Sequence, residues 1–382
     1  MGWCRYESAR ARPGAGVSPR ARELGLRIGT GEPGPHDAIT DVAGVRVGSV
    51  TLIAGDDVRT GVTVVLPGAG DPVATPRFAG CHRLNGNGEL TGLEWIRESG
   101  RLTSPIALTN THSVGVVRDA LVAASVAGRR DEMFWSLPVV GETWDGGLND
   151  VNGFHVRAEH VHAALAAAAG GPVAEGSVGS GTGMICHDFK GGLGTASRVV
   201  GAAHGGFTVG VLVQANHGQR ERLSVAGLPV GRVLGPDVVP LPGGPPARGS
   251  IIVLCATDAP LLPHQCTRLA QRAALGIART GGVGEHHSGD FVLAFSTAEQ
   301  DIPPSELEVP EPVTATVTML VDSHIDPLFV AAVEATEAAI VNALLAAETM
   351  TGRGGVTAHG LEADVLVDAM RRLGGQWALS RR

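Results

Sequence analysis

The chain has 382 residues, of which 43% are hydrophobic and 18% are charged, a globular composition that is long enough to bury a large core. Its formal net charge of −8 at pH 7 argues against nucleic acid as a partner. No uninterrupted apolar run reaches the length of a membrane span, so no membrane partner is expected.

The N-terminal segment 1–21 is rich in Arg, Gly and Pro and lacks the apolar region of a secretory signal. We expect it to be a disordered extension that precedes one catalytic domain over 22–382. The five cysteines form no C-x-x-C pair and have no zinc-ligand spacing, so free thiols in a reducing compartment, and hence a cytoplasmic protein, are expected.

The first part of the chain alternates strand and helix patterns. Two glycine-rich stretches, 176–183 and 190–197, interrupt it. The predicted strands are a short pair in 38–48, then 59–67, 105–108, 137–144 and 207–215, and the predicted helices begin after the polar loop 85–92, after the polar segment 109–113 and at 163.

The second part repeats the order of strand and then helix. Apolar β-branched residues predict a buried strand at 250–256, and the amphipathic pattern of 262–279, closed by two glycines, predicts a helix. Further strands are predicted at 291–297 and 310–320, and further helices at 325–346 and 361–373. With no fixed-period repeat, this order favours a layered α/β sandwich.

Ser250 stands at an abrupt boundary, because a Gly/Pro-rich run ends at Gly249 and a buried strand begins at once. Glycine lacks a Cβ, so the seryl oxygen can approach the preceding carbonyl. If the Gly249–Ser250 bond breaks, Ser250 gains an α-amine with a pKa of roughly 7.7–8.0, which can serve as its own general base. The ordinary alternative is a plain loop end.

Three polar residues at strand ends are candidates to assist Ser250. Ser288 and Asp290 are two positions apart, so both side chains can lie on one face and stabilise a protonated amine. Asn216 ends a strong strand, and its carboxamide can donate to an oxyanion. Turn and capping roles remain the alternatives.

Glu142 and Trp144 share one face of an extended segment. Glu142 can bind a substrate ammonium and Trp144 can pack on the substrate or donate its indole N–H. The alternatives are an ion-paired glutamate and a core tryptophan. The adjacent His286 and His287 are interpreted as solvated loop residues and not as a metal site, because neighbouring side chains on an extended segment point to opposite faces. The glycine-rich stretch 176–183 is interpreted as a turn or an active-site wall and not as a phosphate cradle.

Several collinear motifs from Arg22 onward make the chain resemble the DmpA-like aminopeptidases, a family that includes L-aminopeptidase/D-esterases and β-peptidyl aminopeptidases. The motifs are AITDV at 38–42, RTGVT at 59–63, NGNGE at 85–89, TNTHSVG at 109–115, ETWDG at 142–146, LND at 148–150, NHG at 216–218, GSII at 249–252, ATDAPL at 256–261, SGD at 288–290 and TMTG at 349–352.

The resemblance implies an αββα four-layer sandwich like that of the N-terminal-nucleophile hydrolases, cleaved into chains 1–249 and 250–382. It makes Ser250 the nucleophile, Asn216 the oxyanion donor and Ser288 its assistant. Asp290 stands at an acidic position, where its side chain is one methylene shorter than a glutamate and reaches less far toward the nucleophile. Trp144 replaces the tyrosine of some members, so a donating hydroxyl is absent.

The resemblance further implies an aminopeptidase or amidase that takes short peptides and aminoacyl amides or esters, of L-, D- or β-amino acid type. It implies no cofactor and no metal, and a homo-oligomer that is a tetramer or larger. Two alternatives stay open: an acyltransferase that uses an amine acceptor, and an uncleaved, non-catalytic homologue that binds peptides.

Overall fold

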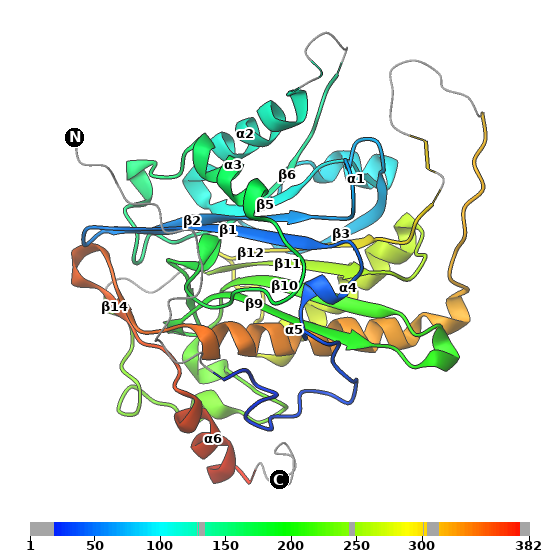
Figure 1. Cartoon of the computed structure of the whole chain (residues 1–382). Helices are drawn as coiled ribbons and strands as arrows, with labels where there is room; N and C mark the ends of the chain where they lie inside the picture. The colour runs from blue at the N-terminus through cyan, green and yellow to red at the C-terminus, as the bar shows by residue number, and fades with distance from the viewer. Residues whose placement is uncertain are drawn as a thin grey trace.

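The computed structural model describes residues 19–127, 129, 134–243, 249–300, 302–303 and 313–374. Two β-sheets lie face to face at its centre (Figure 1). The four-stranded sheet has the order β1 (Arg46–Ala54), β2 (Val58–Leu66), β5 (Ile106–Asn110), β6 (Val139–Thr143). The six-stranded sheet has the order β4 (Arg101–Leu102), β3 (Arg77–Gly86), β12 (Gly289–Ser296), β11 (Ser250–Thr257), β10 (Thr208–Asn216), β9 (Gly192–Val199).

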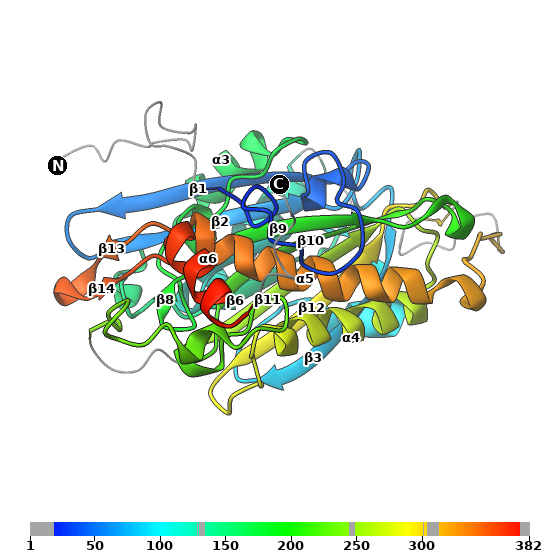
Figure 2. The ribbon, with the colours of Figure 1, turned by 90° about the horizontal axis from the view of Figure 1, so that it is seen from below.

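Helices cover both outer faces of the paired sheets. Helices α2 (Val114–Val126) and α3 (Ala158–Ala167) lie on the four-stranded sheet. Helices α4 (Pro263–Arg279) and α5 (Asp326–Ala346) lie on the six-stranded sheet, as the view from below shows (Figure 2). This arrangement confirms the αββα four-layer sandwich.

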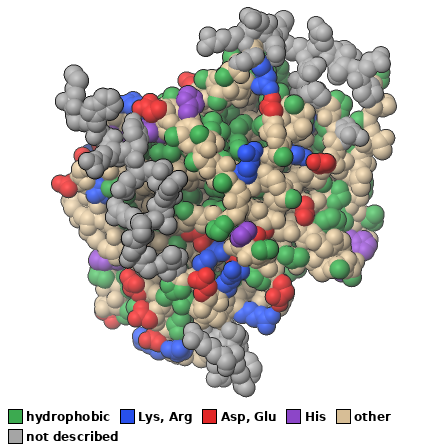
Figure 3. All heavy atoms as spheres, viewed as in Figure 1, with side chains coloured by type: hydrophobic (Ala, Val, Ile, Leu, Met, Phe, Trp, Pro, Cys, Tyr) green, Lys and Arg blue, Asp and Glu red, His purple; other side chains and the backbone are tan. Residues whose placement is uncertain are grey.

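The smaller elements lie at the edges of these layers. They are α1 (Leu93–Ser99), α6 (Ala363–Arg372), the two-stranded pair β7 (Ile185–Cys186) and β8 (Phe189–Lys190), and the pair β13 (Met350–Thr351) and β14 (Thr357–Ala358). On the face shown in Figure 3, basic and acidic side chains of the described residues are interspersed.

The strand that begins at Ser250 is buried along its whole length, because layers cover both of its faces. Ile252 and Leu254 point into the core between the sheets. Ile251 and Val253 point to the other side, into the core that α4 and α5 share with the sheet. Burial on both faces explains the continuous apolar run of this strand.

Most predicted elements are found within two residues of their expected ends, but the helix expected from 163 begins at Ala158, and three further points need correction. The strand pair expected in 38–48 is wrong: Ile39–Asp41 form a 3-10 turn, held by Asp41 Oδ2 accepting the Ala38 N–H, and β1 pairs with β2 instead. The strand expected at 310–320 is also wrong, since 313–320 contain no strand and the rest lies outside the described residues.

The third correction concerns strands that were not predicted. Gly192–Val199, which begins inside the glycine-rich stretch 190–197, forms edge strand β9, and Arg77–Gly86 forms β3. Glycine masks the strand pattern of β9 because α5 lies directly on it. A Cβ on Gly194 would come within 1.9 Å of the Ala339 carbonyl oxygen.

Helix α5 is long and apolar enough to cross a membrane, with a mean hydropathy of 1.7, although no uninterrupted apolar run was expected to reach that length. In the fold, 89% of this apolar window is buried, because the helix packs against β9, β10 and α4. Its apolar character is that of a core helix.

Candidate active site

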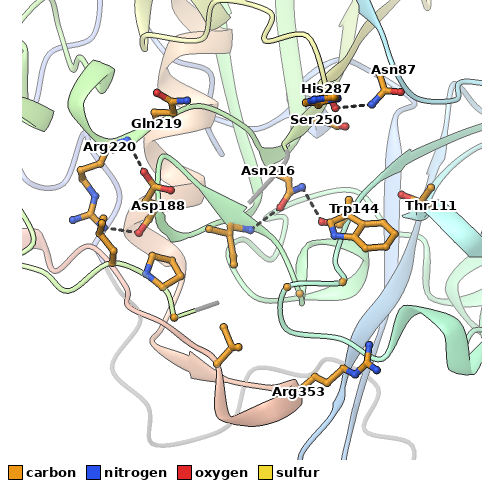
Figure 4. Close-up of a pocket in the computed structure, with 18 of the residues that line it drawn as sticks. Asn87, Thr111, Trp144, Asp188, Asn216, Gln219, Arg220, Ser250, His287 and Arg353 are labelled. Atoms are coloured by element: carbon orange, nitrogen blue, oxygen red, sulfur yellow. Dashed lines mark hydrogen bonds between the residues drawn. The ribbon is translucent and has the colours of Figure 1, made fainter. Parts of the chain in front are cut away.

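Ser250 and Asn216 are cross-strand neighbours. Ser250 is the first residue of β11, Asn216 is the last of β10, and the antiparallel register pairs them directly. Both line a cavity of about 1450 Å³, together with Glu142 and Trp144. Figure 4 shows Ser250, Asn216 and Trp144 in this cavity. The fold therefore brings four of the predicted site residues to one cavity, although Glu142 and Ser250 are 108 positions apart in the sequence (250 − 142).

The Ser250 hydroxyl is buried and held by a backbone group. Its Oγ accepts a hydrogen bond from the Gly289 N–H, at 3.0 Å, and Gly289 opens the adjacent parallel strand β12. Sequence reasoning did not identify this donor, because a backbone N–H has no signature in the side chains. The contact fixes the nucleophile oxygen at the edge of the cavity.

The missing Cβ of Gly249 serves packing as well as the expected access of the seryl oxygen to the preceding carbonyl. A Cβ at this position would lie 2.2 Å from the Asn216 carbonyl oxygen and 2.5 Å from the Cα of His217. Backbone atoms cannot yield to such a contact as a flexible side chain can. The bond proposed for cleavage is thus packed tightly against the end of β10.

The Asn216 carboxamide is fixed by two backbone groups. Its Oδ1 accepts the Ile185 N–H at 2.7 Å, and its Nδ2 donates to the Trp144 carbonyl at 2.9 Å (Figure 4). These partners define which end of the amide is oxygen and which is nitrogen. One hydrogen on Nδ2 is used by Trp144, so the second is available to a substrate oxygen in the cavity.

Ser288 and Asp290 lie on one face, as their spacing predicts. The Ser288 hydroxyl donates to Asp290 Oδ1 at 2.5 Å. Among the described residues, the hydrogen bonds of the Asp290 carboxyl come from Ser288 and the Ile251 N–H and not from the nucleophile Ser250. Burial raises the pKa of Asp290 to about 6, while the hydrogen bonds from Ser288 and the Ile251 N–H act in the opposite direction. Ser288 and Asp290 flank Gly289, whose N–H contacts Ser250.

Glu142 is a buried carboxylate held by hydrogen bonds. Oε1 accepts the Glu89 N–H at 3.0 Å, and Oε2 accepts the Thr111 hydroxyl. Burial raises the pKa of Glu142, and these two hydrogen bonds oppose that shift. Among the described residues no ion pair reaches it, so its charge is available to a substrate cation.

Trp144 is not a core residue, since it is 38% exposed and lines the cavity. Its ring lies close to Gly146, where a Cβ would be 2.4 Å from the indole, and it meets His112 edge to face at 5.8 Å. Its backbone carbonyl, and not its indole, contacts Asn216. The ring forms a wall of the cavity.

The structure also shows where His286, His287 and the glycine-rich stretch 176–183 lie. His286 and His287 are exposed, as expected for solvated loop residues, and His287 lies at the cavity. Gly183 also lines the cavity, which supports the active-site wall expected for 176–183. Thr111 is a site residue that the sequence reasoning left in a polar strand end, and only its contact with Glu142 distinguishes it.

Comparison with known proteins agrees with this geometry. The model of peptidase family S58 matches residues 37–358. The chain belongs to peptidase family S58. It is 49% identical to the β-peptidyl aminopeptidase BapA of Sphingosinicella microcystinivorans over 377 residues, which cover 93% of each chain. It is 44% identical to the BapA of Sphingosinicella xenopeptidilytica, covering 93% of this chain and 92% of that one.

Two solved structures of the family superpose on it closely. A β-aminopeptidase from Burkholderia sp. has a TM-score of 0.89 and 57% identity, and an L-aminopeptidase D-Ala-esterase/amidase from Ochrobactrum anthropi has 0.85 and 45%. Each match covers 93% of this chain and 99% of the other. The second is described as a variant of the Ntn hydrolase fold. This S58 member is accordingly a serine aminopeptidase with an Ntn hydrolase fold.

Proposed function

We propose that this S58 enzyme removes β-amino acids from the N-terminus of short peptides, amides or esters, with Ser250 as a nucleophile that self-cleavage exposes. The observation that carries the catalytic part of the proposal is the direct pairing of Asn216 with Ser250 at a cavity that also holds Glu142. A nucleophile, an oxyanion donor and an anion for the substrate amine thus share one space.

Self-cleavage begins when Ser250 Oγ attacks the Gly249 carbonyl carbon. The C–O bond forms, the C–N bond breaks, and the proton from Oγ passes to the leaving nitrogen, which becomes the free α-amine. Water then hydrolyses the ester and leaves Gly249 as a carboxylate. The tight packing of Gly249 on Asn216 and His217 supports a peptide bond held in one geometry for this attack.

Substrate hydrolysis uses the same oxygen. The α-amine of Ser250 takes the Oγ proton as Oγ attacks the substrate carbonyl, and then gives it to the leaving amine. Water, deprotonated by the same amine, then cleaves the acyl ester on Oγ, so that the acyl group leaves as a carboxylate and Oγ regains its proton. Asn216 Nδ2 donates to the oxyanion, and Glu142 binds the substrate ammonium. Ser288 and Asp290 position Gly289 between them, and they stabilise the positive charge that the Ser250 α-amine acquires when it takes the proton. Trp144 packs on the acyl group.

The β-amino acid preference rests on the relatives. Three similar proteins are named for β-peptides or β-amino acids, at 57%, 49% and 44% identity. A β-aminoacyl group carries its amine one carbon further from the carbonyl than an α-aminoacyl group. The separation of the Glu142 carboxylate from Ser250 Oγ therefore decides which group is productive.

A panel of p-nitroanilides tests the preference, with β-homoalanyl, L-alanyl and D-alanyl groups compared by kcat/KM. We expect the β-homoalanyl substrate to be cleaved at least about tenfold better, which corresponds to about 1.4 kcal/mol of transition-state binding. A preference for the L- or D-alanyl substrate would reject it. Adding a free amine as acceptor distinguishes hydrolysis from the acyltransferase alternative, which predicts an amide product.

A further inference from the structure

A sulfur and two imidazoles lie together beside the cavity, outside the groups used above. Cys186, His187 and His217 each offer one ligand atom, and these atoms all lie within 4.8 Å of one another. The Cys186 Sγ is 3.7 Å from His217 Nδ1. All three side chains are at most 2% exposed. Their chain neighbours Ile185 and Asn216 line the cavity.

The fold, and not the sequence spacing, creates this cluster. Cys186 ends β7 and His217 follows directly after β10, so 31 positions separate them (217 − 186). The His187 N–H donates to the His217 carbonyl at 2.7 Å, which joins the two segments. His187 and Asp188 adopt positive φ angles of 50° and 57°, and this turn presents Cys186 and His187 side by side.

Two imidazole nitrogens in the cluster lack partners. Within the described part of the chain, Nε2 of His187 and Nε2 of His217 are buried without a hydrogen bond. His187 Nδ1 lies 3.1 Å from the Gln219 carbonyl oxygen, so Nδ1 carries the hydrogen and Nε2 presents a lone pair.

We propose that Cys186, His187 and His217 bind one thiophilic divalent cation, of which Zn²⁺ is the type. Tetrahedral Zn²⁺ with Zn–S of about 2.3 Å and Zn–N of about 2.0–2.1 Å separates its ligand atoms by about 3.3–3.6 Å. The observed 3.7 Å between sulfur and His217 Nδ1 is close to this value, so His217 would ligate through Nδ1 and His187 through its free Nε2. The ligand atoms are up to 4.8 Å apart and would move closer on binding. On binding, the Cys186 thiol releases its proton to solvent as the Zn–S bond forms, and water takes the fourth position.

The ion would join β7 to the end of β10 at the oxyanion donor. The residue before Cys186 is Ile185, whose N–H holds Asn216 Oδ1, and the residue before His217 is Asn216 itself. The cation is thus a structural tie for a catalytic group and takes no part in the hydrolysis. We expect it to raise the melting temperature, and a chelator to lower it, while Ser250 remains the nucleophile.

Co²⁺ titration of the untagged, metal-free full-length protein tests the site, because cobalt bound to a thiolate absorbs strongly in the near ultraviolet. We expect a band that saturates at one equivalent and disappears when Zn²⁺ is added. Cys186→Ser should abolish it. The matched control Cys255→Ser, which alters an equally buried cysteine in β11, should retain it.

A second control addresses the exposed pair His204 and His324, whose Nδ1 atoms lie 3.3 Å apart. Replacing both by alanine should leave the band unchanged. If the wild type gives no thiolate band, or if the band survives in Cys186→Ser, the proposal is wrong. Should Cys186→Ser fail to fold, His187→Ala must weaken cobalt binding at least tenfold, and unchanged binding would likewise overturn the site.

Discussion

At the scale of single residues, Glu142 is a buried anion whose two oxygens accept hydrogen bonds from Glu89 and Thr111. Glu142 has no ion-pair partner among the described residues, so a substrate ammonium would supply the opposite charge. We predict that Glu142→Gln lowers kcat/KM roughly 30- to 150-fold, equivalent to about 2–3 kcal/mol, because a desolvated charge pair is lost.

Self-cleavage distinguishes substrate binding by Glu142 from a structural role of Glu142, because cleavage of the chain involves no substrate ammonium. Glu142→Gln should therefore still yield two chains. The control Glu94→Gln removes an exposed carboxylate in α1 and should leave kcat/KM unchanged. If Glu142→Gln keeps the kcat/KM of the wild type, the substrate amine is bound elsewhere.

Asp290 makes stability depend on pH, since burial raises its pKa from 3.8 to about 6. Between these values the folded protein holds the proton and the unfolded chain has released it, so the free energy of unfolding falls as pH rises. The loss is on the order of 3 kcal/mol. It is complete above about pH 6, where both states are ionised.

Asp290→Asn should remove this component. Measured by urea denaturation in a Ser250→Ala background, the variant should gain stability relative to its parent as pH rises from 4 to 6. Asp368→Asn, which alters an exposed carboxylate, should follow the parent curve. A constant difference between Asp290→Asn and the parent across this range contradicts the assignment.

At the scale of elements, helix α5 lies so close to β9 that Gly194 has no room for a side chain. We predict that Gly194→Ala destabilises the protein by about 1–3 kcal/mol, because the helix must move away from the strand. Gly115, inside α2, has no atom within 4 Å of an added Cβ.

Gly115→Ala is the matched control, and it should be neutral or stabilising by about 0.5–1 kcal/mol through helix propensity. Thermal and urea denaturation of both variants measure the difference. Equal effects of the two substitutions would show that the contact between α5 and β9 is looser than described.

Helices and strands could be predicted from the sequence where the spacing of apolar residues is regular and the residue types suit the element. The buried strand after Ser250 and the helix 263–279 show plain patterns and are found there. The edge strand β9 is hidden by the glycines that α5 requires. Likewise, Ser288 and Asp290 are close in sequence and their contact was foreseen, whereas the pairing of Asn216 with Ser250 depends on register between distant strands.

At the scale of the whole molecule, the proposed cleavage would divide the central sheet between two chains. Strands β3, β4, β9 and β10 precede Gly249, and β11 and β12 follow it. Strand β11 lies between β10 and β12, and β12 pairs with β3. The two chains therefore share ladder hydrogen bonds and both cores.

We predict that the two chains stay associated after cleavage. They should co-elute in size-exclusion chromatography and separate only in denaturant, because separation would expose a strand buried on both faces. Light scattering in the same run measures the assembly, which we propose to be a homo-oligomer of four or more copies. Elution of a free 250–382 fragment in native buffer would contradict the shared sheet.

The central claim is that Ser250 becomes an N-terminal nucleophile, and intact-mass analysis with N-terminal sequencing tests it most directly. The wild type should give two chains, one ending at Gly249 and one whose first residue is Ser250. Ser250→Ala should give one full-length chain without aminopeptidase activity. A wild-type protein that hydrolyses substrate as one uncleaved chain, or a Ser250→Ala variant that is cleaved and active, would contradict the account.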